Sequence, residues 1–113
     1  MNNEKHVYFD ALTGVKVTRL TSYRANSNHL YFTNNCFYDV GRRMVFASER
    51  GNAHNLFSME LESGEIEQIT DFPVPKNLAR YDLHMSYVDG VNARCVCFMG
   101  KELLCIDLKT LSV

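Results

Sequence analysis

Histidines are the side chains of this 113-residue chain best suited to proton transfer or metal binding, because they titrate near neutral pH and their ring nitrogens ligate metals. Their spacing offers no local cluster, since neither His-x-His nor His-Glu-x-x-His occurs. The sequence also lacks a Gly-rich phosphate loop and a nucleophile elbow. It therefore predicts no catalytic residue and no metal ligand within the chain. The histidines are His6, His29, His54 and His84.

Cysteines at positions 36, 95, 97 and 105 could in principle hold a metal or form disulfides. Cys95 and Cys97 belong to an apolar run that predicts a strand, where both side chains point to the same side. A structural zinc site instead pairs cysteines about two residues apart around a tight turn. No other feature indicates an oxidising compartment. We expect reduced cysteines that pack in the core.

Basic and polar side chains in predicted loops are the candidates for ligand binding. Arginine is the side chain best suited to a carboxylate, because its guanidinium can donate two parallel hydrogen bonds. The alternative for each loop arginine is a solvated surface charge. Arg50 and Arg80 are the leading candidates, and Arg24, Asn28 and His29 accompany them.

A repeated motif indicates which elements position these loops. Residues 10–14 (Asp-Ala-Leu-Thr-Gly) lead to Arg19-Leu20-Thr21, and residues 60–64 (Glu-Leu-Glu-Ser-Gly) lead to Gln68-Ile69-Thr70. A third copy begins at Asp107, with Leu111 in the glycine position. The acidic residues of successive copies are 50 and 47 residues apart, which is the period of a propeller blade.

Short segments rich in aromatic and β-branched residues, separated by turn residues, predict an all-β fold. A propeller blade has four antiparallel strands, the innermost of which lines a central channel. The sequence predicts about two such blades of a larger β-propeller; the resemblance described below implies a seven-bladed one. The expected strands cover residues 6–10, 15–21, 31–37, 43–48, 55–61, 65–70, 83–88, 93–99 and 102–108.

The repeat divides the chain into three parts. We expect residues 1–21 to be the outer strands of a ring-closing blade, 22–70 the first complete blade and 71–113 a second, truncated blade. Closed rings need about four to eight blades, so the expected partners are the remaining blades. A longer protein would supply them; the alternatives are association of several copies and a small self-contained β-sandwich. Loops 22–30, 49–54 and 71–82 would share the ligand-binding end.

The overall charge does not indicate a macromolecular partner. The formal net charge of −1 leaves no basic excess for nucleic acid or an anionic membrane surface. Apolar runs such as residues 95–99 are far shorter than the about 20 residues that span a bilayer. The N-terminus has no apolar signal-peptide core. We therefore expect a cytoplasmic protein with no nucleic-acid or membrane partner.

Three segments, residues 10–21, 28–37 and 39–47, resemble the N-terminal region of oligogalacturonate lyases, and the resemblance continues from Asn52 to Phe72. Its most specific part joins Tyr31-Phe32-x-x-x-Cys36-Phe37 to the motif that ends in Arg19-Leu20-Thr21. The Asp39-x-Gly41 turn and the strand after it also resemble the WD40-like repeat of TolB-type propellers.

The first resemblance implies a seven-bladed propeller lyase of intracellular pectin breakdown, which cleaves short oligogalacturonates by β-elimination. It also implies an acidic oligosaccharide as substrate and Mn²⁺ as cofactor, held by histidines and a glutamine in later blades. The chain alone would then be inactive. The second resemblance implies the alternative, a non-catalytic propeller module that binds other proteins.

Overall fold

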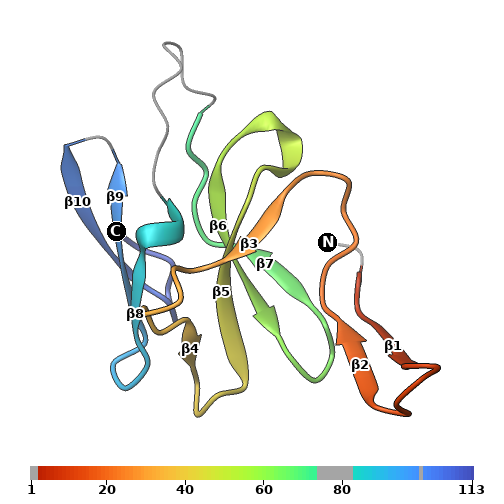
Figure 1. Ribbon diagram of the computed structural model, residues 1–113. Helices are drawn as coiled ribbons and strands as arrows, with labels where there is room; N and C mark the ends of the chain where they lie inside the picture. Colours follow the sequence, from red (N-terminus) through yellow and green to blue (C-terminus); the bar gives the residue numbers. More distant parts are fainter. Residues whose placement is uncertain (1–2, 74–82, 100) are drawn as a thin grey trace.

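In the computed structural model, which describes residues 3–73, 83–99 and 101–113, antiparallel strands form three sheets in chain order (Figure 1). Two 3₁₀ turns interrupt them, η1 (Arg50–Asn52) and η2 (Leu83–Met85). Within these described ranges, no helix has the length and apolar character to cross a membrane. The all-β prediction, with antiparallel blade-like sheets, is confirmed.

The first sheet is a hairpin of β1 (His6–Phe9) and β2 (Lys16–Arg19). The second, here called the central sheet, has four strand positions from inner to outer edge. The third, the C-terminal sheet, has the order β8, β9, β10. The central sheet consists of β3 (Ser27–His29) and β4 (Phe37–Tyr38) at the inner position, then β5 (Arg43–Ser48), β6 (Asn55–Glu60) and β7 (Ile66–Gln68). The C-terminal sheet consists of β8 (Tyr87–Asp89), β9 (Arg94–Met99) and β10 (Glu102–Asp107).

The sequence motif folds into the same turn three times. In each copy the amide of the acidic residue donates to the carbonyl five positions later, at 2.8 Å for Asp10 and 2.9 Å for both Glu60 and Asp107. The glycine position has a positive φ each time: 73° at Gly14, 79° at Gly64 and 60° at Leu111. Glycine suits this conformation because it has no Cβ. The repeat is therefore structural, and the third copy places a leucine in the strained position.

The central and C-terminal sheets share one register, because Arg43 pairs with Glu60 and Arg94 pairs with Asp107. Each sheet has two faces, which we name by the acidic residue of the motif. The forward face carries the side chains two and four positions before that residue. The backward face carries the side chains one and three positions before it. The forward faces carry Val45, Ala47, Leu56 and Ser58 in the central sheet, and Val96, Phe98, Leu103 and Cys105 in the C-terminal sheet. The backward faces carry Met44, Phe46, Phe57 and Met59, and Cys95, Cys97, Leu104 and Ile106.

The main core forms where the forward face of the central sheet packs against the backward face of the C-terminal sheet. Val45 and Leu56 from one side and Cys95 and Cys97 from the other are fully buried. Burial of a large apolar side chain stabilises the fold by about 1.5–3 kcal/mol. A second cluster covers the backward face of the central sheet and includes Leu20, which follows the hairpin.

All four cysteines are free thiols, as the sequence predicts, but the core placement holds for Cys95 and Cys97 and is wrong for Cys105, which is exposed; Cys36 is half-buried. Burial raises the pKa of Cys95 to about 12 and that of Cys97 to about 11, with a further rise from neighbouring thiols. Both therefore remain protonated and behave as small apolar side chains within the main core.

The innermost strand of the central sheet differs from the prediction. Residues 31–37 do not form one strand; instead β3 and β4 both pair with β5, and residues 30–36 leave the sheet between them. The amide of Asn34 donates to the carbonyl of Tyr31 at 2.7 Å, which turns the chain outward. The predicted strand 83–88 is likewise shorter, because η2 occupies its first half.

Candidate functional site

Two of the loops that the sequence predicts at the ligand-binding end, 22–30 and 49–54, lie at the same end of the molecule. Figure 1 shows η1 and the segment between β2 and β3 at the top, and the hairpin turns at the bottom. Arg80 and most of the loop 71–82 lie outside the described residues. The other candidates, Arg24, Asn28, His29 and Arg50, occupy three different environments.

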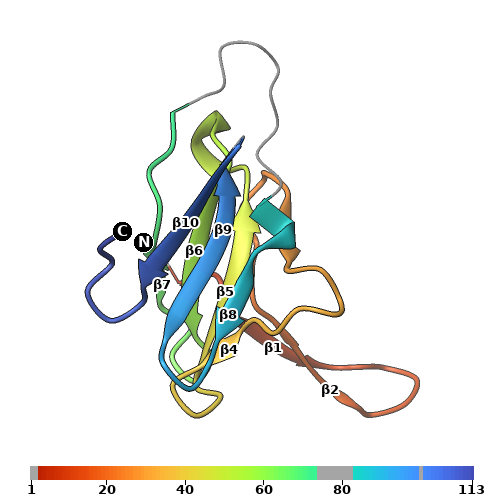
Figure 2. The ribbon, with the colours of Figure 1, turned by 90° about the vertical axis from the view of Figure 1, so that its left-hand side faces the viewer.

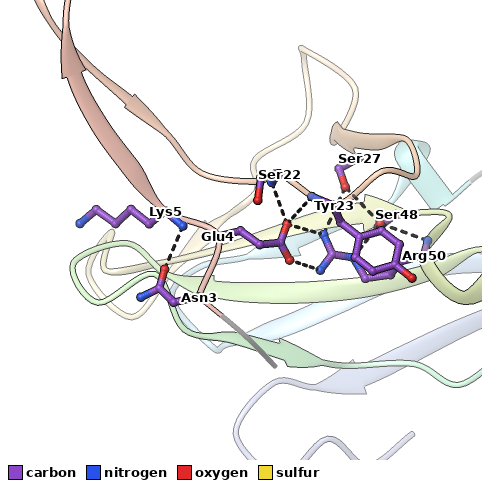
Figure 3. Close-up of polar contacts among 8 residues, drawn as sticks. All are labelled: Asn3, Glu4, Lys5, Ser22, Tyr23, Ser27, Ser48 and Arg50. Carbon is purple, nitrogen blue, oxygen red and sulfur yellow. Dashed lines mark hydrogen bonds and ion pairs between the residues drawn. The ribbon is translucent and has the colours of Figure 1, made fainter.

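Arg50 is inside the fold, with only 8% of the residue exposed. Its guanidinium lies 4.9 Å from the ring centre of Tyr23 and 5.1 Å from that of Phe57, so aromatic faces surround the charge. Nη1 donates to the Glu4 carboxylate at 2.7 Å (Figure 3). Arg50 thus binds a carboxylate, as its chemistry predicts, and the carboxylate belongs to the chain itself.

Glu4 is held from both sides. Its Oε1 accepts hydrogen bonds from the amides of Ser22 at 2.8 Å and Tyr23 at 2.9 Å (Figure 3). Burial raises the pKa of Glu4, but the hydrogen bonds from Arg50 and from these amides outweigh burial and leave the pKa below its ordinary value. Together with Lys5, whose Nζ donates to the Leu61 carbonyl at 3.0 Å, this contact attaches the N-terminal hairpin to the central sheet.

Arg24 lies at the surface, where it lines a hollow of about 430 Å³ beside η1. The acid in that hollow, Glu49, already has partners, because Asn26 donates to it at 3.0 Å and His54 lies 3.6 Å from it. Arg24 has no ion-pair partner among the described residues. Its charge is therefore available to an anionic ligand at the loop end.

Asn28 and His29 are exposed neighbours on β3, and both line an apolar hollow of about 200 Å³ next to Phe46. His29 Nδ1 lies 2.5 Å from the carbonyl oxygen of Leu30. A carbonyl can only accept, so Nδ1 carries the proton in this contact. In the neutral imidazole, Nε2 is then left as an acceptor for a ligand hydroxyl.

The excursion at residues 30–36 carries an exposed aromatic pair, Tyr31 and Phe32, outside the site residues that the sequence predicts. The rings of Tyr31 and Phe32 lie together, with centroids 4.6 Å apart, and remain 39% and 78% exposed. They line a hollow of about 550 Å³ that also includes His29. We call this pair the aromatic ledge.

Two asparagine side chains fix the position of the ledge. Asn34 Nδ2 donates to the carbonyl of Met85 at 3.0 Å, and Asn35 Nδ2 donates to that of Val88 at 3.0 Å. Figure 2 shows the excursion standing out beside η2 and β8. Two adjacent aromatic residues followed by Thr33, Asn34 and Asn35 are the sequence signal that could have indicated this excursion. Aromatic residues are also typical of strands, so the same residues fit a strand.

The exposed side chains around β3 and the loop before it are of kinds that bind polar ligands. Among residues 3–73, 83–99 and 101–113, no group of three or more His, Cys, Asp or Glu side chains is placed to hold a metal ion. Exposed aromatic rings beside an imidazole, and a guanidinium in the neighbouring loop, are groups that recognise polar organic ligands.

Comparison with known proteins confirms the resemblance found in the sequence. No protein-family profile matches the chain. Over 66 residues the chain is 30% identical to the oligogalacturonide lyase of Pectobacterium atrosepticum and 29% identical to the oligogalacturonate lyase of Dickeya dadantii. Each alignment covers 58% of this chain and 17% of the relative, so the chain spans about one sixth of the length of these relatives.

Solved structures show the same fold. The oligogalacturonate lyase from Vibrio parahaemolyticus superposes with a TM-score of 0.77 and 24% identity, over 96% of this chain and 28% of that one. An oligogalacturonate lyase in complex with manganese gives the same TM-score and identity, over 96% of this chain and 27% of that one. The backbone of nearly the whole chain is therefore found within these larger proteins.

Proposed function

We propose that this chain is a section of a seven-bladed propeller lyase that cleaves short oligogalacturonates by β-elimination, and that its loop end contacts the substrate. The observation that carries the proposal is the agreement of two similarities: the curated relatives and the superposed structures are all oligogalacturonate or oligogalacturonide lyases. The division into a ring-closing hairpin, a complete blade and a second blade is part of this proposal.

The proposed reaction removes the proton next to the uronate carboxylate and expels the glycosidic oxygen at the adjacent carbon. A general base must reach that proton, and a cation stabilises the charge that develops on the carboxylate. The superposed manganese complex suggests Mn²⁺ for the second role. The described residues do not fit such an ion, since no suitable group of side chains occurs among them. We therefore place the metal ligands and the base in other blades.

The chain's own contribution is substrate binding. The aromatic ledge offers Tyr31 and Phe32 to the apolar face of a sugar ring, in the way that exposed aromatic rings bind flat apolar surfaces. His29 Nε2 is free to accept from a sugar hydroxyl, and Asn28 lies beside it. Arg24, which has no ion-pair partner among the described residues, suits the uronate carboxylate.

Titration of the ¹⁵N-labelled chain with digalacturonate, followed by NMR, tests this assignment. We expect shifts at residues 28–33, and about two- to twelvefold weaker binding for Phe32→Ala, since ring contacts contribute about 0.5–1.5 kcal/mol. Leu12→Ala is the matched control, because Leu12 is 95% exposed in a hairpin turn at the opposite end. A neutral galactose disaccharide separates ring contacts from carboxylate contacts, and Arg24→Ala should matter only for the acidic sugar.

Absence of shifts with digalacturonate would overturn the binding role and favour the alternative, a non-catalytic propeller module. Catalysis has its own readout, the ultraviolet absorbance of the unsaturated product. We expect no turnover by the 113-residue chain, with or without Mn²⁺, because the proposed base and metal ligands lie elsewhere. Turnover by the isolated chain would contradict that placement.

A further inference from the structure

The segment between β2 and β3 carries Arg24 but has little backbone support of its own. Among the described residues, no backbone-to-backbone hydrogen bond begins or ends at residues 21–25. Arg24 itself is exposed. Side chains from elsewhere in the fold must therefore set the course of this segment, and with it the place of the charge that Arg24 offers.

One carboxylate supports the start of the segment. Glu4 Oε1 accepts hydrogen bonds from the amides of Ser22 at 2.8 Å and Tyr23 at 2.9 Å, and Oε2 accepts from Arg50 Nη1 at 2.7 Å (Figure 3). Only 10% of the Glu4 side chain is exposed. The carboxylate therefore joins the segment to the guanidinium, and both of its oxygens are in use.

Arg50 supports the same segment at two further points. Its guanidinium lies 4.9 Å from the ring centre of Tyr23, and Nη2 donates to Ser27 Oγ at 3.4 Å. Nε donates to Ser48 Oγ at 3.0 Å, and Ser48 is 3% exposed, so the guanidinium is itself fixed to the end of β5. Ser27 begins β3, the strand that carries the other described site residues predicted from the sequence.

We propose that Glu4 and Arg50 are positioning residues for ligand binding: together they hold residues 22–27 in place and so determine where Arg24 presents its guanidinium. Neither side chain needs to touch the ligand. A segment that is already ordered loses less conformational entropy on binding, so the pair raises affinity by preorganisation. The inference rests on the proposed function, because it gives the pair a role in the loop that contacts the substrate.

A separate contact of the N-terminal segment provides the matched control. Lys5 Nζ donates to the carbonyl of Leu61 at 3.0 Å and to that of Glu62, on the far side of the central sheet from the loop. Lys5→Met removes these hydrogen bonds and leaves Glu4 and its partners in place. If the ion pair did no more than attach the N-terminal segment, the two variants would affect the loop alike.

Glu4→Gln is the test variant, because it keeps the size of the side chain but leaves one acceptor oxygen in place of two. That oxygen cannot serve both the loop amides and Arg50. Backbone ¹⁵N order parameters of the ligand-free chain measure the result. We expect those of residues 22–25 to fall from about 0.85 to below about 0.6 in Glu4→Gln, and to stay high in Lys5→Met. Order parameters describe the folded state, so a lower free energy of unfolding does not by itself change them.

Tyr23→Ala tests the same role without leaving a buried charge unpaired. The Tyr23 ring is 51% exposed, so this variant should keep the fold of the parent chain. It removes the contact between the loop and the face of the guanidinium. We expect the order parameters of residues 22–25 to fall in this variant as well, while those of β5 stay unchanged.

Binding of digalacturonate gives the second readout. We expect about tenfold weaker binding by Glu4→Gln, because the ligand must then order the loop, and a change of less than about twofold by Lys5→Met. A loop that stays rigid in both Glu4→Gln and Tyr23→Ala, an equal loosening in Lys5→Met, or unchanged binding by a loosened loop would each overturn the positioning role. A parent chain that does not bind digalacturonate would overturn the proposed function, and the order parameters would still decide whether the pair positions the loop.

Discussion

The carboxylate of Glu4 and the guanidinium of Arg50 meet at 2.7 Å across 46 positions of sequence, with 10% and 7% of their side chains exposed. The contact joins the segment before the hairpin to the turn after β5. Removal of one partner of a buried ion pair leaves an uncompensated charge, which costs more than loss of a surface contact. The pair therefore has consequences that can be measured separately for stability and for pH dependence.

We expect Glu4→Gln to lower the free energy of unfolding by about 3 kcal/mol, because it leaves Arg50 buried without its counter-charge. Urea denaturation followed by circular dichroism measures the change. The control is Glu49→Gln, since Glu49 is 42% exposed where it meets His54 at 3.6 Å and such surface pairs contribute about 0–1 kcal/mol. Equal losses in the two variants would show that Arg50 does not depend on Glu4.

Acidification should destabilise the chain through the same carboxylate. The pKa of Glu4 in the folded protein is below its ordinary value of 4.5, so the unfolded chain binds the proton more readily. The stabilisation is fully present above that ordinary value and is lost as the pH falls through the folded pKa. We expect Glu4→Gln to flatten the acid limb of a plot of stability against pH. An unchanged acid limb would contradict the role assigned to Glu4.

Val40 is a second place where one substitution should have a clear effect. It is 94% exposed and has a φ of 56°, a conformation that costs a non-glycine residue about 1–2 kcal/mol and that asparagine tolerates better. Val40→Asn should therefore raise the thermal midpoint. Val91, equally exposed in the corresponding turn but without a positive φ, is the matched control. If Val91→Asn stabilises the chain as much, relief of backbone strain is not the cause.

Thiol reactivity should report the packing of the main core. Cys105 is exposed, whereas Cys95 and Cys97 are fully buried and their pKa values are raised to about 12 and about 11. At pH 8 a disulfide reagent should modify Cys105 first, and the two buried thiols only as the chain unfolds, because the thiolate is the reactive form. Mass spectrometry after brief exposure identifies the modified sites. Early modification of Cys95 would contradict the observed packing of the sheets.

Much of the fold could be predicted because the repeated motif depends on local chemistry. The acidic residue, the hydroxyl residue and the glycine of the turn bond to one another within a few positions, so Asp10 and Glu60 mark equivalent turns without any long-range information. Strand positions followed from segments rich in aromatic and β-branched residues between turn residues. The break at residues 30–36 could not be predicted in this way, because it depends on hydrogen bonds from Asn34 to η2 and from Asn35 to β8, about fifty residues later.

The candidate site could likewise be predicted only in part, because some of its contacts join residues far apart in the sequence. Loop positions put Arg24, Asn28 and His29 at one exposed end, but sequence distance gave no sign that Glu4 would meet Arg50. A guanidinium attracts any carboxylate that the fold brings within reach, and only the folded chain shows which one that is. Aromatic residues favour strands, so residue type predicts a strand at Tyr31 and Phe32, whereas their exposure follows from the excursion.

Because the inner strand is split into β3 and β4, substitutions in the segment between them need not change the pairing of the strands. Because β3 and β4 each hold their own pairs with β5, the register of the central sheet is fixed on both sides of residues 30–36. Residues 31–33, which lie outside the core and carry neither asparagine anchor, can then vary without shifting a strand. Laboratory selection for new ligands could randomise Tyr31 to Thr33 while leaving the sheets and both asparagine anchors untouched.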